Sequence, residues 1–133
     1  MALVHPYVYK KKITQKQDKL ISNIPLDKPR IWIDFNEFVD SDDEGVSVYL
    51  FSQCDVVNDS NGSDVEVFEG MKVSVFDVDL DENGNPDALL ADGMIVKNYL
   101  SDYPKVKWFI KLNNCKGKYR SNNSNVYWMS DLM

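Results

Sequence analysis

KVKWFIKL, residues 105–112, shows the clearest structural pattern in this sequence. Apolar residues occupy every second position, and lysine or phenylalanine fills the positions between them. Successive side chains of a β-strand point to opposite faces of the sheet, so this alternation is typical of a strand with one buried face. The segment therefore predicts a strand rather than a helix.

The same alternation recurs in shorter runs after residue 30, at 31–36, 46–51, 64–68 and 71–76. Turn-forming residues separate these runs, and Asp92-Gly93 is interpreted as a bulge or turn within 89–98. We therefore expect an all-β domain of six to eight strands, forming a small antiparallel barrel or a curled sheet. The alternation predicts a core that includes Ile33, Val48, Val73, Val75, Val96, Trp108 and Ile110.

Residues 1–30 differ in composition from the rest of the chain. Thr14 and Gln17 have the spacing of a capping box, which predicts a short helix over 15–22. Pro25 and Pro29 would end such a helix and form a linker. We therefore expect an N-terminal arm at 1–30 and a single β domain at 31–133.

Length and composition restrict the class of protein. The 133 residues fit one domain, and no apolar run approaches the roughly 20 residues that a membrane-spanning helix needs. The N-terminus lacks the order of a signal peptide, because its first lysines follow the apolar residues. Cys54 and Cys115 are interpreted as ordinary thiols of a cytoplasmic protein, while a disulfide between them would imply export.

Charge is strongly segregated along the chain. Residues 31–104 contain 18 acidic residues but only two basic ones, Lys72 and Lys97, which gives this segment a net charge of −16. Such a charge repels nucleic acid and anionic lipid and attracts a basic partner or a divalent cation. We therefore expect a basic protein partner, with no nucleic acid and no membrane bound; solubility alone is the competing explanation.

Catalytic chemistry has few candidates in this sequence. His5 is the only histidine, and it lies in the expected arm, so the domain has no histidine for a catalytic triad. The six glycines are scattered and form no phosphate-binding loop. We therefore expect a protein that is not an enzyme and has no cofactor, although an enzyme using a carboxylate pair stays open.

One acidic loop resembles a calcium-binding sequence. Asp79, Asp81, Asn83 and Asp87 stand at positions 1, 3, 5 and 9 of such a loop, with glycine at position 6. Position 12, which requires a bidentate glutamate, is Leu90. The loop at 79–87 is therefore interpreted as an acidic hairpin, with a calcium-binding β module as the alternative.

Aromatic residues fall on the polar side of several predicted strands, opposite the aliphatic residues: Trp32, Tyr49, Phe51, Phe68, Phe76 and Phe109. Aromatic side chains among acids are typical of a surface that recognises a basic protein. The alternative is that a second layer of the protein covers them. On the first interpretation, the binding residues are Trp32, Asp34, Glu37, Asp42, Asp43, Glu44 and Tyr49.

The segments at 31–38, 69–73 and 79–93 resemble parts of small, uncharacterised acidic β proteins of bacteria. Some proteins of that kind act as immunity proteins, which block an antibacterial toxin. The resemblance implies a bacterial cytoplasmic origin and supplies no catalytic residues. It makes an immunity protein against a basic toxin, such as a nuclease, the most specific form of the binding hypothesis.

Overall fold

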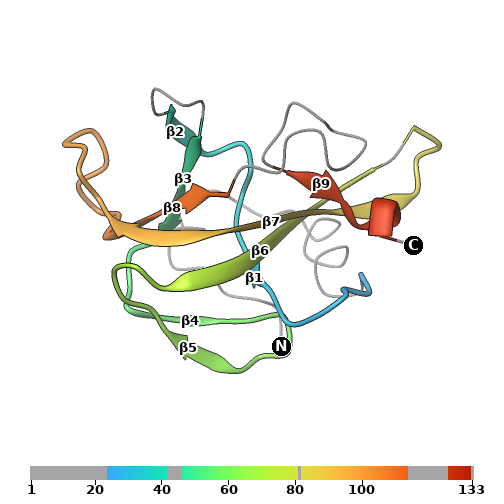
Figure 1. The fold of residues 1–133 in the computed structure, drawn as a ribbon, viewed down its shortest axis with the longest axis horizontal. Coiled ribbons are helices and arrows are strands. Elements are labelled where there is room, and N and C mark those ends of the chain that lie inside the picture. The colour runs from blue at the N-terminus through green and yellow to red at the C-terminus, as the bar shows by residue number, and fades with distance from the viewer. Residues whose placement is uncertain (1–23, 42–45, 81, 114–125, 133) are drawn as a thin grey trace.

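The computed structural model describes residues 24–41, 46–80, 82–113 and 126–132 (Figure 1). The predicted N-terminal helix at 15–22 lies outside these residues. Strands account for 51% of the structure, and within the described ranges the sole helical element is a 3-10 turn at Met129–Leu132. The nine strands are β1 (Ile31–Trp32), β2 (Phe38–Ser41), β3 (Ser47–Ser52), β4 (Val56–Asn58), β5 (Asp64–Glu66), β6 (Lys72–Leu80), β7 (Pro86–Lys97), β8 (Trp108–Leu112) and β9 (Tyr127–Trp128).

Seven of these strands form one sheet in the order β1-β6-β7-β8-β3-β2, with β9 paired to β7, and β4 and β5 form a separate hairpin. The all-β prediction is confirmed, but the barrel form is wrong. The two end strands, β1 and β2, follow each other in the chain and are not paired with each other, so no hydrogen-bond ladder closes the sheet. The pairing is also mixed, because β1 runs parallel to β6, and the described residues alone contain nine strands instead of the predicted six to eight.

The β4–β5 hairpin covers one face of the sheet. Figure 1 shows the hairpin beneath β6. Val57 and Val65 of the hairpin, with Val67 just after it, pack into the largest apolar cluster, together with Val75 and Ile110 of the sheet. Burial of this continuous apolar surface is the main force that holds the two sheets together.

Two smaller clusters cover the opposite face. At one end Phe76 and Leu90 are buried in a cluster with Tyr127, the partner of Leu90 on β9, and Ile24 and Leu26 pack against this cluster. At the other end Phe109 and Leu50 are buried beneath the connection between β7 and β8, which contributes residues of the range 100–106. The hairpin therefore covers one face of the sheet, and these two clusters cover the ends of the other.

Because both faces of the sheet are covered, the structure distinguishes the two interpretations of the aromatic residues, an exposed recognition surface or residues covered by a second layer. The second-layer alternative holds for four of the six, because Trp32, Phe51, Phe76 and Phe109 are buried. Phe68 is exposed and Tyr49 is half-buried. Six of the seven predicted core residues are buried, and the seventh, Val96, is half-buried because it borders an open groove.

A buried arginine ties the chain before β1 to the sheet. The side chain of Arg30 is 1% exposed, and its guanidinium forms two hydrogen bonds to the carboxylate of Asp27, at 2.8 and 3.0 Å. It also donates to the backbone carbonyls of Val75 and Ala91 and to the hydroxyl of Tyr127. One side chain thus links β6, β7 and β9 to residues that precede the first strand.

Candidate functional site

Three aromatic rings cluster at the β2 end of the sheet. Tyr49 of β3 is packed edge-on by Phe35 at 5.5 Å and by Phe38 of β2 at 5.8 Å between ring centroids. Tyr49 is half-buried, and this burial raises the pKa of its hydroxyl. Phe38 is 51% exposed. The cluster thus combines a fixed aromatic base with one ring that is open to solvent.

Acidic residues of the β1–β2 connection lie in the same segment as this cluster. The connection is a tight turn, in which the backbone N–H of Glu37 donates to the carbonyl of Asp34 at 2.9 Å. The carbonyl of Glu37 accepts a hydrogen bond from Leu50 of β3, which fixes the turn against the sheet. We call Asp34, Phe35, Glu37, Phe38 and Tyr49 the β2 edge patch.

The β2 edge patch contains part of the set predicted from sequence. Asp34, Glu37 and Tyr49 belong to it, whereas Trp32 is 6% exposed and offers little surface to a partner. Asp42, Asp43 and Glu44 lie outside the described residues. The prediction omitted Phe35 and Phe38, although both stand among acids in the segment IWIDFNEF at 31–38.

A half-buried carboxylate, Asp77 of β6, holds the start of the connection in place. Its Oδ1 accepts hydrogen bonds from the indole Nε1 of Trp32 at 2.9 Å and from the N–H of Val78 at 2.8 Å. Its Oδ2 accepts one from the N–H of Phe35 at 3.1 Å. Burial raises the pKa of Asp77 to about 6, although these three hydrogen bonds favour the charged carboxylate and act to lower it. The negative charge of Asp34 adds to the rise.

Asp34 and Asp77 are one pair of carboxylates to which the enzyme hypothesis applies, because the charge of Asp34 acts on Asp77. A raised pKa marks some catalytic acids, but structural networks raise pKa values as well. The Asp77 carboxylate faces three N–H donors of the protein. Its geometry is that of a structural acceptor that positions Trp32 and Phe35.

The acidic loop at 79–87 joins β6 to β7. Asp79 and Asp87 are direct partners across the hairpin, and Gly84 has a φ of +80°, which suits the tight turn that the sequence predicts. Asp87 is buried and accepts a hydrogen bond from the hydroxyl of Ser130 at 2.7 Å. Asp81 lies outside the described residues. Among those described, no group of three or more His, Cys, Asp or Glu residues could hold a metal ion.

This geometry makes a prediction about calcium. Because Asp87 is directed to Ser130 and position 12 is Leu90, millimolar calcium should leave the melting temperature nearly unchanged. Thermal melting of the protein with and without millimolar calcium would measure the effect. A clear rise in melting temperature that the Asp79→Asn variant abolishes would instead favour the calcium-binding β module.

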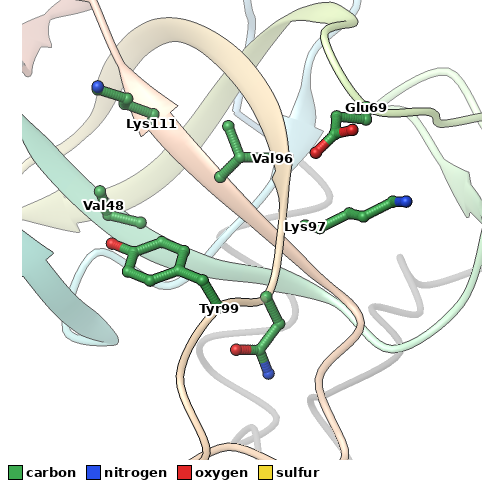
Figure 2. Close-up of a pocket in the computed structure, with 7 residues that line it drawn as sticks. Val48, Glu69, Val96, Lys97, Tyr99 and Lys111 are labelled. Atoms are coloured by element: carbon green, nitrogen blue, oxygen red, sulfur yellow. The ribbon is translucent and has the colours of Figure 1, made fainter.

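A groove of about 380 Å³ lies on the opposite face of the sheet from Tyr49, because Val48, the neighbour of Tyr49 on β3, lines it. Figure 2 shows Val96 near its centre, Val48 and Tyr99 on one side, and Glu69 and Lys97 on the other. The ring of Tyr99 packs edge-on against Phe109 at 5.6 Å, and its hydroxyl donates a hydrogen bond to the carboxylate of Asp40. These contacts fix Tyr99 as one wall of the groove.

Comparison with known proteins gives no relative for this chain. No family model matches it, and neither the curated proteins nor the solved structures contain a match.

Across the described ranges, no helix has the length and apolar character to span a membrane. Cys54 is an exposed free thiol, and Cys115 lies outside the described residues.

Proposed function

We propose that this protein is a non-enzymatic binding protein whose β2 edge patch takes a basic protein partner. The observation that carries the proposal is the exposed ring of Phe38, which lies on the last strand at one end of the sheet and packs on Tyr49. Aromatic anchors of this kind supply much of the binding energy in protein interfaces.

Charge supports the same assignment. Asp34 and Glu37 stand in the turn that leads into β2, within a segment of net charge −16. Acids around an aromatic anchor favour a partner that presents lysine or arginine, because complementary charge accelerates the encounter of the two proteins. An immunity protein that blocks a basic toxin is the specific form of this proposal.

Replacing Phe38 tests the anchor. Immobilised wild-type protein should capture its partner from an extract of the cells that encode it, and the partner is then identified by mass spectrometry and purified. We expect Phe38→Ala to weaken binding of the purified partner at least about tenfold, as loss of an interface anchor does. The matched control is Phe68→Ala, since Phe68 is 60% exposed but lies in the β5–β6 connection. Equal affinities of the Phe38→Ala variant and the wild type would contradict the proposal.

The acids are tested by their effect on association rate. Asp34→Asn combined with Glu37→Gln should slow association, and the effect should shrink as salt rises, because the Debye length falls to about 8 Å at 0.15 M. The control pair Glu66→Gln and Glu82→Gln removes two exposed charges elsewhere on the acidic segment. If both pairs slow association equally, net charge rather than the β2 edge patch steers binding.

A further inference from the structure

Asp77 connects the β2 edge patch to the interior strands of the sheet. It lies on β6, and its carboxylate accepts hydrogen bonds from the indole of Trp32 at 2.9 Å and from the backbone N–H of Phe35 at 3.1 Å. Phe35 belongs to the β2 edge patch and packs edge-on against Tyr49. One carboxylate of the sheet thus holds the first residues of the turn that carries the acids of the patch.

The charged groups next to Asp77 that the structure describes are acidic. Asp34 stands immediately before Phe35 in the chain, and its negative charge acts on Asp77. On β6 itself, the next residue on the same face is Asp79, which is exposed. The direct partner of Asp77 on β7 is Leu89, which has no charge, and no ion pair among the described residues reaches Asp77. The ionised carboxylate therefore has N–H donors but no cation.

Protonation changes what the carboxylate of Asp77 can do. The ionised group is an acceptor only, and it accepts hydrogen bonds from three N–H donors. A neutral carboxyl carries a proton that itself needs an acceptor, and hydrogen bonds between neutral groups are roughly half as strong as those to an ionised one. Protonation of Asp77 therefore weakens the hold on Trp32 and Phe35 at the start of the turn.

A cation bound beside Asp34 acts back on Asp77. It offsets the negative charge that disfavours ionisation of Asp77, so it favours the ionised carboxylate. Linkage is reciprocal, so ionisation of Asp77 favours the bound cation by the same factor. Because burial raises the pKa of Asp77 to about 6, this group changes its charge near neutral pH. That range lies above the ordinary carboxylate pKa values of about 4.

We propose that Asp77 is a pH-dependent switch for the β2 edge patch: its ionised carboxylate holds the turn and favours a basic partner, and its protonation as the pH falls weakens the binding of that partner. Asp77 is a positioning residue in this arrangement, since it acts through Phe35 and through the charge of Asp34. The inference rests on the proposed function of the β2 edge patch and adds a regulation by pH to it.

The switch is tested first in the protein alone. The ¹³C signal of the Asp77 carboxyl carbon should titrate between about pH 5 and 7, and the backbone amide signals of Phe35 and Phe38 should follow it with the same midpoint. Asp34→Asn should lower that midpoint, because it removes the negative charge that acts on Asp77. The matched control is Asp79→Asn, since Asp79 is exposed and is not among the groups that shift the pKa of Asp77. Equal midpoints in the two variants, or amide signals that do not follow Asp77, overturn the proposal.

A defined basic probe then tests the effect on binding. An acetylated and amidated pentapeptide of four arginines around a central leucine has no group that titrates between about pH 5 and 7. The shifts of the Phe38 and Tyr49 amides should give a Kd at least about fivefold lower at pH 7 than at pH 5, which is the low end of the coupling between linked sites. Asp77→Asn should bind the peptide equally at both pH values. Both proteins contain His5, the single histidine, so its titration cancels in the comparison.

The two experiments separate failure of the switch from failure of the proposed function. If the peptide shifts Phe38 and Tyr49 with the same affinity at both pH values, the switch is overturned, while the β2 edge patch still binds a basic ligand. The switch is also overturned if Asp77→Asn keeps the full pH dependence of the wild type. If the peptide shifts neither residue at either pH, the proposed function fails, and the switch has no basic ligand to release even where Asp77 titrates as expected.

Discussion

Arg30→Met is expected to lower the free energy of unfolding by about 3–5 kcal/mol, because it leaves three buried acceptors without their donor, at about 1–3 kcal/mol for each. Arg30 is 1% exposed and supplies five hydrogen bonds to Asp27, Val75, Ala91 and Tyr127. Methionine has a similar length but no donor. The carboxylate of Asp27 would then lose its cation, and the buried acceptors around the guanidinium would lose a donor that water cannot replace.

Urea-induced unfolding of the variant and the wild type measures this loss. The matched control is Lys28→Met, because Lys28 is half exposed and its nearest carboxylate atom, on Asp92, is 3.9 Å away. An exposed pair of this kind contributes no more than about 1 kcal/mol. A double-mutant cycle with Asp27→Asn then isolates the Arg30–Asp27 coupling. A loss below about 1 kcal/mol for Arg30→Met would show that the guanidinium does not hold the strands together.

The position of Arg30 also shows where sequence reasoning reached its limit. The sequence places Arg30 in the arm at 1–30, and an arginine between a proline and a strand carries no local sign of burial. Its partners are as many as 97 residues away in the sequence. The periodicity of apolar residues depends only on neighbouring positions, so it cannot predict contacts between segments that are far apart in the sequence.

The strands themselves were predictable because their pattern is local. Within the stretch 105–112, strand β8 contributes Trp108 and Ile110 to one face and Phe109 to the other, as the alternation indicates. The strand begins only at Trp108, however, and Val106 packs with Phe109 instead. Alternation could not show that both faces of the sheet are covered, one by the hairpin and the other at its two ends. Aromatic residues such as Phe76 and Phe109 are buried on the second face for this reason. Asp92-Gly93 was wrongly interpreted as a bulge or turn. It lies within the continuous strand β7, where a Cβ on Gly93 would stand 2.6 Å from the carbonyl oxygen of Lys111.

The candidate site was predictable in composition and not in geometry. Acids and aromatic residues at 31–38 suggested a recognition surface, and the structure places Asp34, Glu37 and Tyr49 together. Trp32 was expected to be an exposed anchor but turns inward to donate to Asp77, while Phe38, which the prediction omitted, is half exposed on the last strand. Which of two aromatic residues faces solvent depends on the register of β1 and β2 with distant strands, which the local pattern does not contain.

Asp77 should make the stability of this protein fall as the pH rises from about 4 to 7. Its pKa is about 6 in the folded protein, against 3.8 for an ordinary aspartate, chiefly because burial disfavours the charged carboxylate. Below pH 3.8 both states hold the proton, and this group has no effect on the pH dependence of stability. Between pH 3.8 and 6 the unfolded chain releases the proton while the folded protein retains it, so stability decreases with pH. Above pH 6 the decrease is complete, at about 3 kcal/mol for a rise of roughly two pKa units.

Other carboxylates oppose this trend, so the effect of Asp77 must be isolated by comparison. The pKa of Asp27 is lowered by its hydrogen bond from Arg30, and that of Asp55 by its hydrogen bond from Lys107; both make stability rise with pH. We therefore expect the difference in unfolding free energy between Asp77→Asn and the wild type to shift in favour of the variant by about 3 kcal/mol between roughly pH 3.5 and pH 7.

The Asp77→Asn variant also loses one hydrogen bond, because an amide nitrogen cannot accept from the N–H of Phe35, and this loss adds a constant penalty with no dependence on pH. Urea unfolding at closely spaced pH values gives the curve for each protein. Asp79→Asn, which removes an exposed carboxylate from the same strand, gives the baseline for loss of a surface charge. If the two variants give parallel curves, the carboxylate of Asp77 is solvated in solution, and its hydrogen bonds to Trp32 and Phe35 do not hold the turn that carries Asp34 and Glu37.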